Sequence, residues 1–182
     1  MSKLLYSATM SLDGFIAGVD GDMSWRSAHL GGEQPDPEVA GLVDRIGALL
    51  IGRRTFYGDD PNRGTDAEGA FGGRWQGPSI VLSHDPPRSP PGPDVRFVDD
   101  LEAAVALAKE AAGDRYVNVL GANVAARCLE AGLLDEILVL IAPTLLGDGV
   151  PLFRRPGGAD VRLEPRDPAR DGRTRWWFRV VR

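Results

Sequence analysis

Apolar and polar residues alternate in blocks along the chain, most clearly between residues 114 and 153. Two short apolar runs, Tyr116–Leu120 and Glu136–Ala142, are rich in Val, Ile and Leu, which favour buried strands. Between them the apolar positions fall at four- and five-residue steps, as on one face of a helix: Val124, Cys128 and Leu129. We expect Asn123 to cap this helix and Gly132 to end it. The block therefore predicts a strand, a glycine turn, a helix and a second strand.

The rest of the chain continues this alternation. Six more apolar runs predict strands: Lys3–Met10, Ala48–Ile51, Ser79–Leu82, Val95–Val98, Val161–Glu164 and Arg173–Val181. Helical spacing predicts helices at Pro37–Ile46 and Leu101–Ala112, the second capped by Asp99 or Asp100. The segments Ser11–Trp25 and Gly58–Gly77 are too rich in glycine for long elements, although a short helix is expected near Ala67–Phe71. This order predicts an α/β fold with a mostly parallel sheet, flanking helices and an antiparallel C-terminal strand.

Composition narrows the class of protein. The chain has 182 residues, 43% hydrophobic and 26% charged, which suits one domain with a real core over residues 1–182. The net charge of −5 argues against nucleic acid as a partner. Cys128 is the single cysteine, so we expect no intrachain disulfide and no metal site. The chain has no pattern of a signal peptide and no apolar run of about 18 residues, so we expect a cytoplasmic protein without a membrane span.

Candidate chemistry gathers where three predicted strands end, at Gly52, Ser83 and Gly121. Ligands of parallel sheets bind outside the carboxyl ends of the strands, and a glycine turn into a helix leaves backbone N–H groups free for a phosphate. Arg53 and Arg54 follow the first of these ends, and they are either a phosphate-binding pair or a solvated surface pair. Together these features predict a site for an extended phosphorylated ligand such as a dinucleotide. The GxGxxG fingerprint is absent, so it is not a Rossmann site.

Three motifs carry a resemblance to a known family: SLDGFIAG at 11–18, IGRRTF at 51–56 and GLLDEILVLIAPTLLGDGVPLF at 132–153. They resemble the dihydrofolate-reductase-like superfamily and, more closely, the C-terminal reductase domain of the bifunctional riboflavin-biosynthesis (RibD) deaminase-reductases in its stand-alone form. The resemblance implies a three-layer dihydrofolate-reductase-like fold and a homodimer. It also implies that NADPH donates hydride to a small heterocycle or to a carbonyl or imine carbon.

The resemblance also implies roles for individual residues. Those expected to bind NADPH are Gly52, Arg53, Arg54 and Thr55 at the adenosine 2′-phosphate, Leu82 and Ser83 at the adenine, Gly121, Ala122, Asn123 and Val124 at the pyrophosphate, and Ala8, Ile16 and Gly18 at the nicotinamide. Candidate substrate contacts are Asp13, Trp25, Tyr57, Trp75 and Phe153. For each aromatic residue the alternative is core packing.

Two departures from the related enzymes bear on function. A deaminase domain is not expected, because its zinc signature needs paired cysteines. Leu30 falls near the position where dihydrofolate reductases have a proton-donating acid, which leaves Asp13 and His29 as candidate catalytic residues. The favoured hypothesis is an NADPH-dependent reductase related to the riboflavin-pathway pyrimidine reductase. The alternatives are an NADP(H)-binding protein of the same fold without turnover and a structural dimer module.

Overall fold

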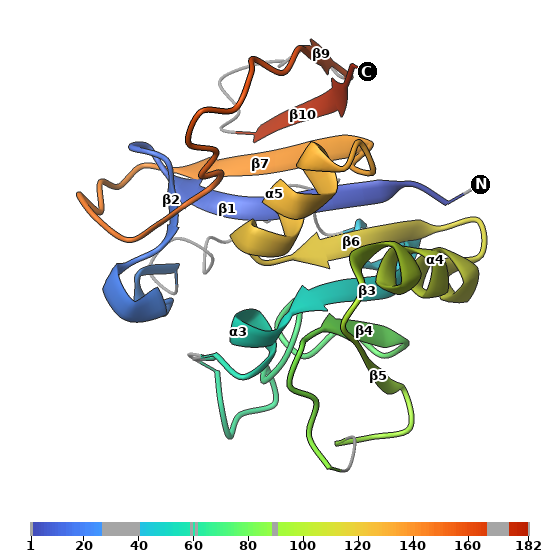
Figure 1. The fold of residues 1–182 in the computed structure, drawn as a ribbon. Coiled ribbons are helices and arrows are strands. Elements are labelled where there is room, and N and C mark those ends of the chain that lie inside the picture. The colour runs from blue at the N-terminus through green and yellow to red at the C-terminus, as the bar shows by residue number, and fades with distance from the viewer. Residues whose placement is uncertain are drawn as a thin grey trace.

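The computed structural model describes residues 2–26, 41–58, 60, 62–88, 91–166 and 175–181. Its centre is an eight-stranded sheet in the order β5-β4-β3-β6-β1-β7-β10-β9 (Figure 1). The strands of this sheet are β1 (Leu4–Ser11), β3 (Ile46–Gly52), β4 (Ser79–Leu82), β5 (Val95–Val98), β6 (Tyr116–Leu120), β7 (Glu136–Ala142), β9 (Leu163–Pro165) and β10 (Arg175–Val180). A separate two-stranded sheet pairs β2 (Phe15–Ala17) with β8 (Val150–Pro151).

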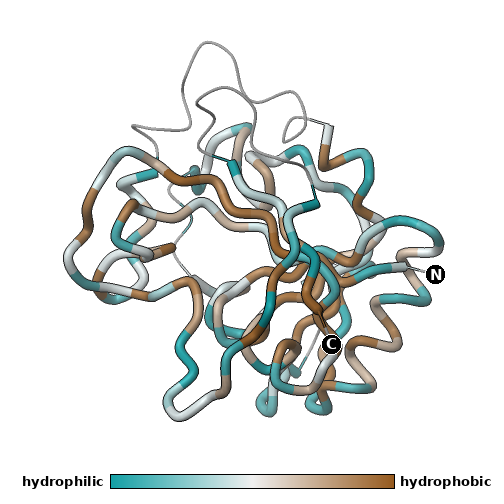
Figure 2. The backbone as a smooth tube through the Cα atoms, turned by 90° about the horizontal axis from the view of Figure 1, so that it is seen from above, coloured by the Kyte–Doolittle hydropathy of each residue, from teal (hydrophilic) through white to brown (hydrophobic). Residues whose placement is uncertain are grey.

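The directions of the strands confirm the predicted fold class. The six strands β5, β4, β3, β6, β1 and β7 run parallel to one another, whereas β10 runs antiparallel to both β7 and β9. Parallel strands are buried on both faces, which explains the continuous apolar run of β3. Figure 2 shows long hydrophobic stretches of the chain running through the middle of the molecule, while hydrophilic stretches lie mostly towards the outside.

Two helices, α4 (Leu101–Ala112) and α5 (Ala122–Glu130), cover one face of the sheet (Figure 1). Asp100 caps α4 as predicted, because its carboxylate accepts a hydrogen bond of 2.8 Å from the Ala103 N–H. The close contact between α4 and β3 depends on Gly47, since a Cβ atom there would collide with the Ala112 backbone. The helices and the sheet thus enclose the larger core, which includes the fully buried Leu4 and Leu50.

Irregular segments cover the opposite face in the described part of the chain. Leu42, Phe71 and Trp75 pack there against Leu49 and Trp177 of the sheet. The loop that contains Phe71 and Trp75 forms turns, so the short helix expected near Ala67–Phe71 is wrong. The segment Gly58–Gly77 has six glycines and mixed polarity, so it has no apolar face long enough for a helix.

Three other expectations about elements need correction. Residues 27–40 lie outside the described residues, and the part of the predicted helix Pro37–Ile46 that is described is a 3-10 turn, Val43–Arg45, followed directly by β3. The glycine-rich segment after β1 contains the short strand β2, because β8 supplies it with a partner. Asn123 is the second residue of α5, and Gly121 occupies the N-cap in its place.

Candidate functional site

The carboxyl ends of β4, β3 and β6 lie side by side, as the sequence predicted. Gly52 pairs with Leu82 across β3 and β4, and Ile51 pairs with Leu120 across β3 and β6. The short helix α3 (Arg53–Phe56) and the longer α5 both start at this edge, on the left in Figure 1. The residues expected at the adenosine and pyrophosphate therefore share one edge of the sheet, although their role in binding stays a prediction.

Two glycines allow the backbones to approach closely at this edge. Gly121 has a φ of 106°, which favours glycine, and a Cβ atom on it would lie 2.5 Å from Thr55 Oγ1. A Cβ atom on Gly52 would lie 3.0 Å from Val124 Cγ2. No side chain caps the start of α5, so the N–H groups of its first turn keep their capacity to bind an anion. Because of this close approach, the N-cap position of α5 holds Gly121, which has no side chain. Asn123, the expected cap, lies two residues further on, inside the helix.

The two arginines after β3 have different surroundings. Arg53 forms an ion pair of 3.2 Å with Asp85, and its guanidinium lies 5.6 Å from the centre of the Tyr57 ring. Ser83 holds the backbone of Asp85, since its Oγ accepts from the Asp85 N–H and donates to the Asp85 carbonyl. Arg54 is exposed. Arg53 is thus oriented by its neighbours, whereas Arg54 lies on the surface beside it.

The residues expected at the nicotinamide lie beyond β1, where two loops pack together. Ala8 is in β1, Ile16 is in β2, and the Gly18 N–H donates to the Asp22 carbonyl at 2.8 Å. The pairing of β2 with β8 requires a glycine at position 149, because a Cβ atom there would collide with the backbone of β2. The loop after β1 and the loop after β7 therefore form one wall at the same edge as the three strand ends at Gly52, Ser83 and Gly121.

Asp13 lies in that wall, and its carboxylate accepts hydrogen bonds from three donors. Ser11 Oγ donates to it at 2.5 Å, the Leu146 N–H at 3.1 Å and the Gly147 N–H at 2.7 Å. The Ser11 hydroxyl and the Gly147 N–H, followed by the Leu146 N–H, hold the pKa of Asp13 below its ordinary value although the loop partly desolvates it. At neutral pH this side chain is a carboxylate without a proton to donate. Its catalytic candidacy is therefore weakened, and His29, the other candidate, lies outside the described residues.

The four aromatic substrate candidates are not brought together. Phe153 packs edge-on against Tyr6, 5.3 Å between ring centres, on the helix-covered face, whereas Trp75 packs on the opposite face. Tyr57 is half exposed at the end of α3, and Trp25 is in the 3-10 turn Ser24–Arg26. Core packing thus accounts for Phe153 and Trp75. Sequence reasoning missed the roles of Asp85, Leu146 and Gly147, because two of them act through backbone N–H groups.

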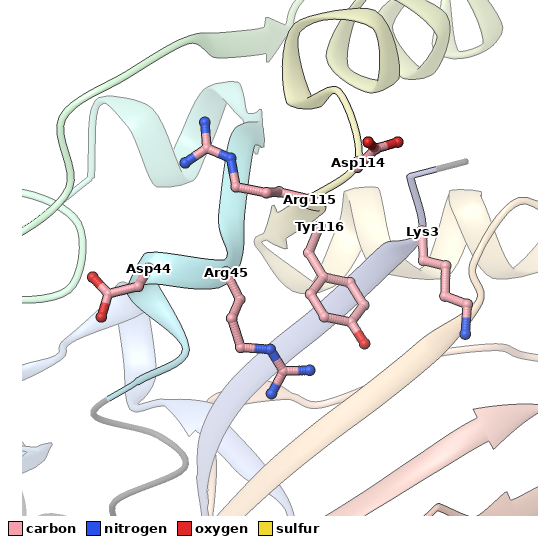
Figure 3. A pocket seen from close by; sticks show the side chains of 6 residues that line it. All are labelled: Lys3, Asp44, Arg45, Asp114, Arg115 and Tyr116. Carbon is pink, nitrogen blue, oxygen red and sulfur yellow. The ribbon is translucent and has the colours of Figure 1, made fainter.

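The opposite edge of the sheet has a different character. A hollow of about 420 Å³ opens there, lined by Lys3, Asp44, Arg45, Asp114, Arg115 and Tyr116. Figure 3 shows that their charged ends point in different directions, so they do not converge on one ligand group. Among the residues that the structure describes, no group of three or more His, Cys, Asp or Glu side chains is placed to hold a metal ion, and no helix is long and apolar enough to cross a membrane.

The fold and the glycine-marked edge define an α/β domain with a candidate site at the carboxyl ends of its parallel strands. Residues 2–173 match the RibD C-terminal domain family, and the chain belongs to that family. It is 27% identical over 159 residues to the Bacillus subtilis (strain 168) protein YyaP, which is described as uncharacterized; the match covers 83% of this chain and 80% of YyaP.

Solved structures agree in fold. A putative riboflavin biosynthesis protein from Shewanella sp. PV-4 superposes with a TM-score of 0.75 at 23% identity, covering 99% of both chains. The riboflavin biosynthesis reductase Rib7 of Saccharomyces cerevisiae superposes with a TM-score of 0.61 at 19% identity, covering 99% of this chain and 90% of that one. The expected family and fold are therefore confirmed, and the family suggests an oxidoreductase related to the riboflavin pathway.

Proposed function

We propose that this protein is an NADPH-dependent reductase that transfers hydride to a small heterocyclic substrate or to a carbonyl or imine carbon. The proposal rests on one observation, the close approach of Gly52, Thr55 and Gly121 at the start of α5, beside the ends of the parallel strands. The glycines let the start of α5 lie directly beside α3 and the end of β3, and the N–H groups of a helix start at the carboxyl edge favour the charge of a pyrophosphate. Family membership supports a reductase related to the riboflavin-pathway pyrimidine reductase.

In this proposal the chain supplies binding and orientation, and the bound cofactor supplies the hydride. The first-turn N–H groups of Ala122, Asn123 and Val124 hold the pyrophosphate, while Leu82 and Ser83 flank the adenine. Ala8, Ile16 and Gly18 hold the nicotinamide against the wall formed by the two loops. The proton that the reduction consumes comes from water or from a substrate group, because Asp13, the catalytic candidate that the structure describes, is held in its ionised form.

The arginines give the proposal its sharpest test. Arg53 is already paired with Asp85, so we expect Arg54 to supply the larger share of recognition of the 2′-phosphate. A charge-assisted hydrogen bond contributes about 1.5–3 kcal/mol, so Arg54→Ala should weaken NADPH binding roughly 10- to 150-fold. NADH lacks that phosphate, and its binding should change little. Arg53→Ala should weaken NADPH binding less, since Asp85 offsets part of its charge.

The measurement is the dissociation constant of each nucleotide, from cofactor fluorescence at fixed salt. Arg115→Ala is the matched control, because it removes an exposed arginine at the opposite edge of the sheet. NADPH at 100 times its Kd should also add about 2.7 kcal/mol of stability. Wild-type protein that shows neither binding nor thermal stabilisation at millimolar NADPH would refute the proposal. An unchanged NADPH/NADH preference in both arginine variants would refute the placement of the adenosine end.

A second candidate function is NADP(H) binding without turnover. The engagement of Asp13 by three donors favours it, because this catalytic candidate is then held as a carboxylate without a proton to donate. NADPH oxidation with a panel of carbonyl and pteridine substrates separates the two functions: turnover supports the reductase, and binding alone supports the second candidate. A homodimer in the cytoplasm is a further part of the proposal, which light scattering and cell fractionation test.

A further inference from the structure

Two loops leave the sheet side by side because the strands they follow are neighbours. β1 and β7 are parallel, and their last residues, Ser11 and Ala142, pair with each other. Backbone hydrogen bonds then join the loops. The Leu12 N–H donates to the Thr144 carbonyl at 2.8 Å, and further along the Leu152 N–H donates to the Gly14 carbonyl at 2.9 Å.

Asp13 adds the remaining connection between the loops. Its carboxylate accepts from Ser11 Oγ within its own loop and from the N–H groups of Leu146 and Gly147 in the other. Ser11 is itself fully buried and also accepts from the Phe15 N–H at 3.0 Å, just where β2 begins. One exposed carboxylate thus fixes the start of β2 against a loop more than 130 residues away in the sequence.

We infer that Asp13 is a positioning residue. It joins the loop 11–18 to the loop 144–149 and so preforms the wall against which the nicotinamide is proposed to bind. This inference rests on the proposed function, because β2 and Gly18 form that wall only if the cofactor binds as proposed. Asp13 acts as a fixed acceptor that transfers no proton. Its low pKa agrees with this role, since every donor around it favours the ionised form.

Replacing Asp13 should displace the two loops that it joins and so misplace the groups of the proposed site that orient the reacting atoms. An asparagine keeps the shape but has no charge and offers one oxygen: with that oxygen on the Leu146 and Gly147 N–H groups, its NH2 group faces Ser11 Oγ, which can then no longer donate to residue 13. A displacement of about 1 Å in a reacting group can cost about 100-fold in rate. We therefore expect Asp13→Asn to lower kcat roughly 10- to 100-fold while the NADPH dissociation constant, dominated by the adenosine half, changes less than about 3-fold.

Two readouts test the inference, with Asp148→Asn as the matched control. Asp148 lies in the same loop, and its carboxylate accepts a hydrogen bond of 2.7 Å from the neighbouring Gly149 N–H. The pH dependence of kcat should keep its shape in Asp13→Asn, whereas loss of a limb would show that Asp13 transfers a proton and would overturn the inference. A kcat equal to that of wild type would also overturn it.

Hydrogen exchange provides a readout that does not depend on turnover. The Leu146 and Gly147 amides should exchange at least about 10-fold faster in Asp13→Asn than in wild type or Asp148→Asn, because they lose a charged acceptor. Unchanged exchange would overturn the inference even if the protein proves not to be a reductase. If Asp13→Asn does not fold, Ser11→Ala keeps the carboxylate, and it should show the same effects at a smaller size; a Ser11→Ala protein identical to wild type in kcat and exchange would overturn the inference.

Discussion

Glu136 is the residue whose replacement we expect to cost most stability at the amino edge of the sheet. Its side chain is fully buried at the start of β7 and accepts four hydrogen bonds. The donors are Lys3 Nζ at 2.9 Å, Tyr116 OH at 3.0 Å, Arg166 Nη1 at 2.7 Å and Trp177 Nε1 at 2.8 Å. One carboxylate of β7 thus joins β6 and β10 to the residue before β1 and to the residue after β9.

The magnitude for Glu136→Gln follows from these contacts. The amide keeps an oxygen for Trp177 and Tyr116, but its NH2 group faces the Lys3 ammonium and its neutrality weakens the bond to Arg166. Two charged hydrogen bonds contribute about 3–6 kcal/mol before solvation is counted. The side chains of Lys3 and Arg166 are 48% and 33% exposed, so water recovers part of that loss. We expect a net loss of about 2–3 kcal/mol at pH 7, or about 4–12 °C in Tm.

The pKa of Glu136 determines how the stability difference between wild type and Glu136→Gln should change with pH. Burial alone raises the pKa of Glu136, but the Lys3 hydrogen bond, the Arg166 charge and the Tyr116 hydroxyl outweigh it and bring the pKa below its ordinary value. A lowered pKa in the folded state means that the carboxylate stabilises the fold above the unfolded pKa of about 4.3. That stabilisation is lost as the pH falls through the folded pKa. The difference between wild type and Glu136→Gln should therefore shrink below about pH 4.

Urea unfolding of both proteins at several pH values between 7 and 3 measures this difference directly. Other titrating groups are common to both chains and cancel in the comparison. Glu130→Gln serves as control, because it removes an exposed carboxylate at the end of α5 and should stay within about 0.5 kcal/mol of wild type. Equal stability of wild type and Glu136→Gln at pH 7, or a difference that does not depend on pH, would refute the reasoning.

Two further predictions concern the helix α5. Gly121→Ala should lower stability by about 1–3 kcal/mol through its positive φ and should also weaken NADPH binding, whereas Gly132→Ala, which has a φ of 68° and open space around it, should lower stability alone. Thermal denaturation and cofactor titration of both variants decide this, and equal NADPH binding by both would contradict the role of Gly121. Burial raises the pKa of Cys128 to about 12, so the native thiol should resist alkylation at pH 8 and react only on unfolding. Rapid labelling of the folded protein would contradict this.

The sequence predicted the elements best where burial alone decides them. The strands Ser79–Leu82, Val95–Val98, Tyr116–Leu120 and Glu136–Ala142 and the helix Leu101–Ala112 have the predicted bounds. The parallel strands are marked by short continuous apolar runs, and the helix by apolar residues at helical spacing on the face that packs against the sheet. The expectation that the glycine-marked strand ends share one edge also holds, since parallel strands place their carboxyl ends together.

Long-range polar contacts could not be predicted in this way. A charged residue looks the same in the sequence whether it is solvated or paired, and the partners of Asp13 and Glu136 lie up to 134 and 133 residues away. The N-cap of α5 shows the same limit on a smaller scale. Asn123 and Gly121 are both acceptable caps locally, and the nearness of Thr55, which the local sequence does not contain, selects the glycine.

The carboxylates of Glu136 and Asp13 lie at opposite ends of the strand pair β1 and β7 and have different structural roles. Glu136 opens β7 and is buried among four donors at the amino edge, while Asp13 follows β1 and lies exposed at the carboxyl edge. The buried carboxylate joins strands to one another, so its loss should appear in the free energy of unfolding. The exposed carboxylate joins only loops, so its loss should leave the sheet intact and appear in the shape of the site. Ligands of parallel sheets bind at the carboxyl edge, and the placement of the two acids allows stability and function to be changed separately in this fold.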